Sequence, residues 1–153
     1  MRKPDTPSRR RFHLLSINVS GMTGVQKRPV GRAVLRQGHG IVGDAHAGDW
    51  HRQVSLLSEE RIETMRGRGV EIGHGDFAEN LTTRGVDLAA LPIGTRLSVG
   101  DAVLEVTQIG KQCHHGCAIY RAVGDCVMPR EGIFTRVIRG GEIDRESECY
   151  YHL

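Results

Sequence analysis

The chain has 153 residues, which suits one domain, and its formal net charge of +3 arises in residues 1–11, where five basic residues meet one acid. The remaining residues are close to neutral, so charge gives no support to a nucleic-acid-binding domain. No window holds the roughly 18 apolar residues of a transmembrane helix, and residues 1–11 lack the apolar segment of a secretory signal. We therefore expect a cytoplasmic protein with no nucleic-acid or membrane partner.

Residues 1–11 are predicted to form a disordered basic tail, and residues 12–153 a single β-rich domain, because 20 glycines and an aromatic content of 5% favour many turns. The first strand is expected at 12–19, where apolar and polar residues alternate. Further strands are predicted at 30–35, 54–57, 96–99, 102–108 and 133–138.

One helix is well marked in the sequence. Ser58 is a good N-cap, and two acids follow it in the first turn, where the helix dipole favours negative charge. Leu57 and Ile62 are spaced as a hydrophobic staple, and Gly67 ends the pattern. The fold class predicted from these elements is a mainly antiparallel β-barrel, closed or partly open, with one or two short helices.

The segment 37–48 is rich in glycine and carries His39, Asp44 and His46. Asp44 and His46 would face the same side of an extended segment, so they are candidates for half of a metal site. The alternative is a polar loop in which the Asp44 carboxylate bonds its own backbone.

Three of the four cysteines, Cys113, Cys117 and Cys126, lie in one stretch between residues 107 and 141. One interpretation is a zinc site built from these cysteines and a histidine, although the second closely spaced ligand pair of a zinc knuckle is missing. A second interpretation is catalytic, because Lys111 and the adjacent His114 would favour the thiolate form of Cys113. A third is that some of the thiols are small buried apolar groups.

The fourth cysteine, Cys149, stands apart near the end of the chain and is expected to be an ordinary unpaired thiol.

The order of several motifs resembles one known family over about residues 12–143. These motifs are SINVSGMTGVQKRPV (16–30), GIVGDAHAG (40–48), DFAENLTTRGVDL (76–88), LPIGTRLSVGDAVLEVTQIGKQCH (91–114) and GDCVMPREGIFTRV (124–137). The family is the MOSC domain, named for the carboxy-terminal domain of molybdenum cofactor sulfurase, and this chain is similar to its short single-domain members.

The resemblance implies a closed barrel like the β-barrel domain of pyruvate kinase, and it implies the handling of molybdenum cofactor (molybdopterin). The family cysteine at the end of the VTQ strand corresponds to Cys113 in this sequence. In relatives that hold the cofactor, the family cysteine ligates the molybdenum. Cys117 and Cys126 would assist as a resolving thiol or a second ligand. Cationic and polar residues in the matching segments are the candidate cofactor-binding residues, namely Lys27, Asp44, His46, Asn80, Lys111 and Arg136.

The leading hypothesis from the sequence is therefore a protein that binds molybdenum cofactor, or carries sulfur for it as a persulfide, during cofactor maturation or delivery. Its partners would be molybdenum cofactor biosynthesis proteins or molybdoenzymes, together with a cysteine desulfurase. The alternatives are a zinc-stabilised non-enzymatic module and a molybdenum-dependent reductase component for N-hydroxylated substrates, which would need an electron donor. Pyridoxal phosphate is linked to the family through the sulfurase and is not expected to bind here.

The end of the chain departs from the family pattern. The segment 140–153, GGEIDRESECYYHL, lacks the Gly-Asp turn that often precedes the closing strand. The sequence therefore leaves the last strand of the barrel unassigned.

Overall fold

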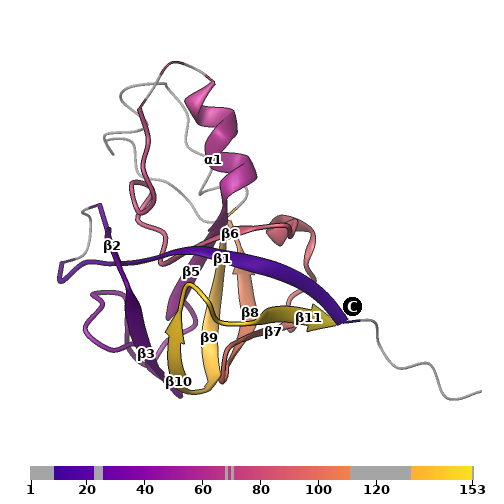
Figure 1. Ribbon diagram of the computed structural model, residues 1–153. Helices are drawn as coiled ribbons and strands as arrows, with labels where there is room; N and C mark the ends of the chain where they lie inside the picture. The colour runs from indigo at the N-terminus through magenta and orange to yellow at the C-terminus, as the bar shows by residue number, and fades with distance from the viewer. Residues whose placement is uncertain (1–8, 23–25, 68, 70, 111–131, 153) are drawn as a thin grey trace, which may run out of the picture.

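The computed structural model describes residues 9–22, 26–67, 69, 71–110 and 132–152. Its main element is a closed barrel of seven strands with one helix, α1, above it (Figure 1). The barrel strands are β1 (Arg9–Val19), β5 (Val54–Ser58), β6 (Leu81–Arg84), β7 (Arg96–Val99), β8 (Ala102–Ile109), β9 (Ile133–Arg139) and β11 (Cys149–His152). The predicted mainly antiparallel barrel is confirmed.

The strands follow the order β11-β7-β8-β9-β5-β6-β1, and pairing of β11 with β1 closes the circle. All neighbouring barrel strands are antiparallel except β5 and β6, which run parallel. The parallel pair needs a crossover connection, and the segment with α1 (Glu59–Arg66) supplies it. The predicted 96–99 and 102–108 hairpin is present as β7 and β8.

Every residue of β5 is buried, because the strand packs against apolar groups on both faces. Val54 and Leu56 face the barrel core, which also contains side chains of β1, β6, β7, β8 and β9. Leu57 faces the other way, into a small cluster with Ile62, Met65, Ile72, Phe77 and Phe134. Burial of this second cluster holds α1 against the barrel.

Helix α1 starts and ends where the sequence places it. Ser58 occupies the N-cap position, although its side chain makes no capping hydrogen bond. Leu57 and Ile62 share the small apolar cluster, as the staple spacing predicts. At the other end the Gly67 N–H donates to Glu63 O at 3.1 Å. A short 3-10 helix, η1 (Leu88–Ala90), follows β6.

A smaller sheet of three strands leaves the barrel wall, in the order β10-β3-β4. Its strands are β3 (Arg32–Arg36), β4 (Gly40–Ile41) and β10 (Gly141–Asp144), and β2 (Arg28–Val30) pairs with the end of β1 just before it. Ile41 is buried in the main core. The segment 37–48 thus contributes a short strand that its low apolar content does not predict.

Both ends of the domain differ from the sequence expectation. Residues 9–11, assigned to a disordered tail, form the start of β1 and pair with β11. The chain also ends in a closing strand without the family's Gly-Asp turn. Asp144 makes the turn instead, because its Oδ1 accepts the Glu146 N–H at 2.8 Å and its N–H donates to Ser147 Oγ at 3.0 Å.

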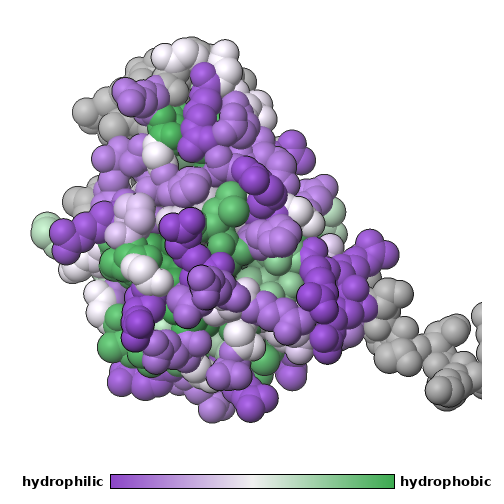
Figure 2. Space-filling model, viewed as in Figure 1, coloured by the Kyte–Doolittle hydropathy of each residue, from purple (hydrophilic) through white to green (hydrophobic). Residues whose placement is uncertain are grey.

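Hydrophilic side chains cover most of the face shown in Figure 2, with small apolar areas between them. Within the residues described, no helix has the length and apolarity needed to cross a membrane.

Candidate functional site

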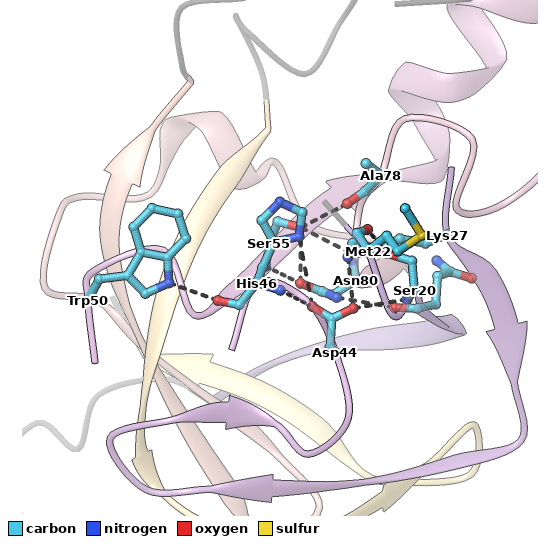
Figure 3. A network of polar contacts seen from close by, with 10 residues as sticks. Ser20, Met22, Lys27, Asp44, His46, Trp50, Ser55, Ala78 and Asn80 are labelled. Carbon is cyan, nitrogen blue, oxygen red and sulfur yellow. Dashed lines mark hydrogen bonds and ion pairs between the residues drawn. The ribbon is translucent and has the colours of Figure 1, made fainter. Parts of the chain in front are cut away.

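The centre of the candidate site is a buried ion pair between Lys27 and Asp44 (Figure 3). Lys27 Nζ lies 2.7 Å from Asp44 Oδ1, and both side chains have no exposed surface. Lys27 Nζ also donates to Ser20 Oγ at 3.2 Å, and the Ser20 N–H donates to Asp44 Oδ1 at 3.1 Å. Two loops that are distant in the sequence are therefore joined by charge as well as by hydrogen bonds.

The backbone segments around the ion pair pack closely against one another. The Lys27 N–H donates to Gly75 O at 2.9 Å, and the Ala45 N–H donates to Ser20 O at 2.8 Å. Gly75 has a φ of +89°, and a Cβ at this position would lie 2.2 Å from Lys27 O. Only glycine accommodates this approach, so the loop before β6 is locked against the Lys27 segment.

The electrostatics of Asp44 follow from these contacts. Burial alone would raise the pKa of its carboxyl group, but the Lys27 hydrogen bond and charge, with the Ser20 and His46 N–H groups, outweigh burial and lower that pKa. Asp44 is therefore a carboxylate at neutral pH. Its charge is balanced inside the protein rather than by a ligand.

The loop interpretation of Asp44 and His46 is confirmed. Asp44 Oδ2 accepts the His46 N–H at 3.0 Å, while the imidazole Nδ1 lies 3.9 Å from the same oxygen. The Trp50 indole N–H donates to His46 O at 2.8 Å and fixes the next turn of the loop. Across the described part of the chain, no group of three or more His, Cys, Asp and Glu side chains is arranged to hold a metal ion.

Asn80 joins the strands beside the ion pair. Its Oδ1 accepts the Ser55 N–H at 2.9 Å, and its Nδ2 donates to Asn18 O at 3.1 Å. Asn80 is completely buried. Both polar atoms of its side-chain amide form hydrogen bonds to backbone groups. Figure 3 shows Asn80 beside Ser55.

Glu79 is a buried acid that the sequence analysis did not select. Its Oε2 accepts the Thr82 hydroxyl at 2.8 Å, while Oε1 has no hydrogen-bond partner in the described structure. Burial raises its pKa, and the Gly75 N–H and Thr82 hydroxyl offset only part of that effect. In the sequence, Glu79 is marked only by its place between Ala78 and Asn80. In the structure, Ala78 has a φ of +63°.

Loop 44–52 connects the ion pair to the end of β8. His51 Nε2 and Arg52 Nε both donate to Gln108 Oε1, at 2.8 and 3.0 Å. Gln108 Nε2 in turn donates to Gly110 O at 2.7 Å. The Gly110 N–H donates to Gly132 O at 2.7 Å, so the chain on both sides of residues 111–131 is tied at one place.

Arg136 lies apart from the ion pair. It projects from β9, its side chain is 53% exposed, and one guanidinium nitrogen lies 3.0 Å from Glu105 Oε1. It lines a hollow of about 510 Å³ together with Trp50, His51 and Thr107. Arg136 and loop 44–52 therefore share a surface hollow beside the end of β8.

The predicted catalytic residues Cys113, Cys117 and Cys126, and the predicted ligand Lys111, lie outside the described residues. Cys149 is described, and it is a buried unpaired thiol in β11. Burial raises its pKa to about 12, so it stays protonated at neutral pH. The expectation of an ordinary thiol at this position is confirmed.

The sequence profile of the MOSC domain matches residues 43–149, from the loop with Asp44 to the first residue of β11. The chain belongs to the MOSC domain family. The match includes the whole barrel from β5 to β9, so the resemblance inferred from the motifs is confirmed. A comparison of this MOSC domain with curated proteins finds no significant match.

Solved structures support the fold of this MOSC domain. The crystal structure of YUAD protein from Bacillus subtilis is similar with a TM-score of 0.81 and 20% identity, over 96% of this chain and 98% of that chain. YiiM from Geobacillus stearothermophilus gives a TM-score of 0.71 at 20% identity, over 93% and 75%. YiiM from Escherichia coli gives 0.66 at 18% identity, over 94% and 70%. At such low identity these likenesses establish the barrel and its topology.

Proposed function

We propose that this MOSC domain binds molybdenum cofactor, or carries sulfur for it, through Cys113. The observation that carries the proposal is the continuous connection from the Lys27–Asp44 pair through loop 44–52 to Gln108. Cys113 follows Gln108 by five residues, and such a span reaches at most about 18 Å. Family membership supports the molybdenum cofactor as the ligand.

The described residues differ in how they would fit that ligand. Lys27, Asp44 and Asn80 are enclosed, and their polar atoms are bonded to protein, so they would support the site without touching the cofactor. Arg136 is exposed in the hollow beside Thr107, and the imidazole of His46 is partly exposed. These two side chains suit an anionic group and a polar ring, respectively.

The cofactor, when bound, would supply a molybdenum centre that takes a thiolate ligand. In this arrangement Arg136 would bind the phosphate group through charge-assisted hydrogen bonds. His51 and Arg52 would keep the end of β8 in place through Gln108. The thiolate of Cys113 would meet the metal, because soft sulfur is the preferred protein ligand for such a centre.

In the sulfur-carrying form, the Cys113 thiolate would attack the outer sulfur of a persulfide on a cysteine desulfurase. One S–S bond breaks and one forms, and the donor leaves as a thiolate, so no net oxidant or reductant is needed. The product is a persulfide on Cys113 and a free thiol on the donor.

The first test is the metal and pterin content of protein purified from a host that makes molybdenum cofactor. We expect molybdenum, and a fluorescent pterin after oxidation, in the wild-type protein. Cys113→Ala should lose the metal, whereas the matched Cys149→Ala control should keep it, because Cys149 lies in β11. Full retention of molybdenum by Cys113→Ala would refute the ligand role.

The second test addresses sulfur transfer. After incubation with a cysteine desulfurase and free cysteine, peptide mass spectrometry should find one added sulfur on Cys113. Addition at Cys149 alone would contradict the proposal.

A further inference from the structure

The hollow beside the end of β8 contains an exposed aromatic ring. Trp50 is 43% exposed, and its indole N–H donates to His46 O at 2.8 Å. This hydrogen bond fixes the direction of the ring, which Figure 3 shows on the side of His46 away from Asp44. The His51 ring meets the indole at an angle of 69°, with centroids 6.1 Å apart. An indole held in this way is a preformed surface on which a planar ligand can stack.

Asp49 lines the same hollow as Trp50. The residue is exposed, and its carboxyl group makes no hydrogen bond or ion pair within the described parts of the chain. Asp44 is different, because its carboxylate is enclosed and paired with Lys27. The carboxyl oxygens of Asp49 are therefore available to accept hydrogen bonds from a ligand.

The lining of the hollow is mixed in charge. Asp49 and Trp50 belong to loop 44–52, while Arg136 projects from β9. One guanidinium nitrogen of Arg136 lies 3.0 Å from Glu105 Oε1, and the side chain stays 53% exposed. The volume of about 510 Å³ is in the range of small-molecule sites. A matching ligand needs a flat face, N–H donors for the carboxyl group and an acceptor for the guanidinium group.

We infer that the hollow binds a planar heteroaromatic ring with an aminopyrimidinone edge, which stacks on Trp50 and donates two N–H groups to Asp49. In such an edge a ring N–H and an amino N–H stand side by side, so they match the two oxygens of one carboxylate. Pterin and guanine share this edge. The inference rests on the proposed function, in which Arg136 binds the phosphate group of the cofactor, and it adds the residues that would select the cofactor's ring.

Trp50 is the single tryptophan of the chain, so its fluorescence reports on this hollow. The test uses the full chain, purified from a host that makes no molybdenum cofactor. The probes are neopterin monophosphate and GMP, which carry the edge, and AMP, which lacks it. Neopterin monophosphate should quench Trp50 and bind at least tenfold more tightly than AMP in calorimetry. Tighter binding of GMP than of neopterin monophosphate would assign the same ring contacts to a guanine nucleotide.

Substitutions test the two contacts separately. Asp49→Asn should weaken the binding of neopterin monophosphate by about tenfold or more, because one of two charge-assisted acceptors is lost and the other becomes neutral. Trp50→Leu should weaken binding by a similar factor, whereas Trp50→Phe keeps a ring face and most of the affinity. Asp101→Asn is the matched control, since Asp101 is exposed in the turn between β7 and β8. Thermal unfolding at the wild-type temperature would show that each fold is intact.

Three results would overturn the inference. They are binding of neither edge-bearing probe, binding of AMP as tight as that of the better of the two, and unchanged affinity in Asp49→Asn. The probes hold no metal, so Cys113→Ala should bind them as the wild type does. Weaker probe binding in Asp49→Asn, with full molybdenum retention in Cys113→Ala, would refute the metal-ligand role alone. The opposite pair of results would refute the ring contacts alone.

Discussion

Two groups of polar residues in the candidate site differ in how far they are buried. Lys27, Asp44 and Asn80 are enclosed, and each is bonded to another part of the protein. Arg136 and His51 stand at the surface, in a hollow beside the end of β8. The enclosed group fixes the loops, whereas the surface group has exposed side chains that a ligand can reach.

The difference shows that a polar residue in a family motif need not touch the ligand. Taking Lys27 and Asp44 out of water is costly, and the cost is offset only by their close contact and the added N–H donors. A lysine paired in this way fixes the conformation of the loops around it and adds little net charge to the site. Substitutions in the two groups should therefore have different effects on stability and on cofactor content.

The largest effect is expected for Lys27→Met. This change removes the cation and leaves the Asp44 carboxylate buried with two backbone N–H donors. We expect a loss of about 3 kcal/mol in the free energy of unfolding, measured with urea at neutral pH. The double variant Lys27→Met/Asp44→Leu should recover part of that loss.

A double variant no more stable than Lys27→Met would show that the uncompensated charge is not the cause. The pair also predicts a pH dependence. Because the pKa of Asp44 is lowered in the folded protein, its contribution is present above the ordinary value of 3.8 and is lost as the pH falls through the folded value.

Asn80→Ala should have the next largest effect. It leaves the buried Ser55 N–H and Asn18 O without their side-chain partners, at a cost of about 2 kcal/mol. Thermal unfolding measures this loss. A wild-type unfolding temperature would contradict the enclosed role of Asn80.

Glu79→Gln should stabilise the protein, and more so as the pH rises. Because the pKa of Glu79 is raised in the folded protein, its neutral form is favoured by folding. That contribution is complete below the ordinary value of 4.5 and is lost as the pH rises toward the folded value. Urea unfolding at pH 5 and pH 8 should show a gain for the variant that is larger at pH 8. An equal gain at both values would mean that Glu79 titrates normally.

Arg136→Ala should have the smallest effect on stability, within about 0.5 kcal/mol, because the side chain is largely exposed. The same variant should retain less molybdenum and pterin than wild type when purified from a cofactor-producing host. Arg139→Ala is the control, because Arg139 is exposed on the same strand. Unchanged cofactor content in Arg136→Ala would place the anionic group elsewhere.

Much of the barrel follows from local sequence. The 96–99 and 102–109 hairpin and the helix after Ser58 are fixed by turn residues, capping and periodicity. The closing strand β11 was left unassigned because the segment before it lacks a Gly-Asp pair, whereas Asp144 makes the turn there with its side chain. Residues 9–11 were missed because their charge suggests solvent, whereas β11 offers them backbone partners.

The candidate site was less predictable than the fold. Lys27 and Asp44 were both selected, but nothing in the sequence reveals that they neutralise each other, since residues 17 positions apart meet only through the fold. The sequence allows Glu79 either to face a ligand or to satisfy a turn, and only the fold shows that the side chain is buried.

We propose that the Cys113 thiolate ligates the molybdenum. X-ray absorption at the molybdenum edge of cofactor-loaded protein tests this contact directly. We expect a protein-derived sulfur neighbour in the wild-type spectrum that is absent in Cys113→Ser and present in Cys149→Ser. An identical sulfur shell in wild type and Cys113→Ser would contradict it.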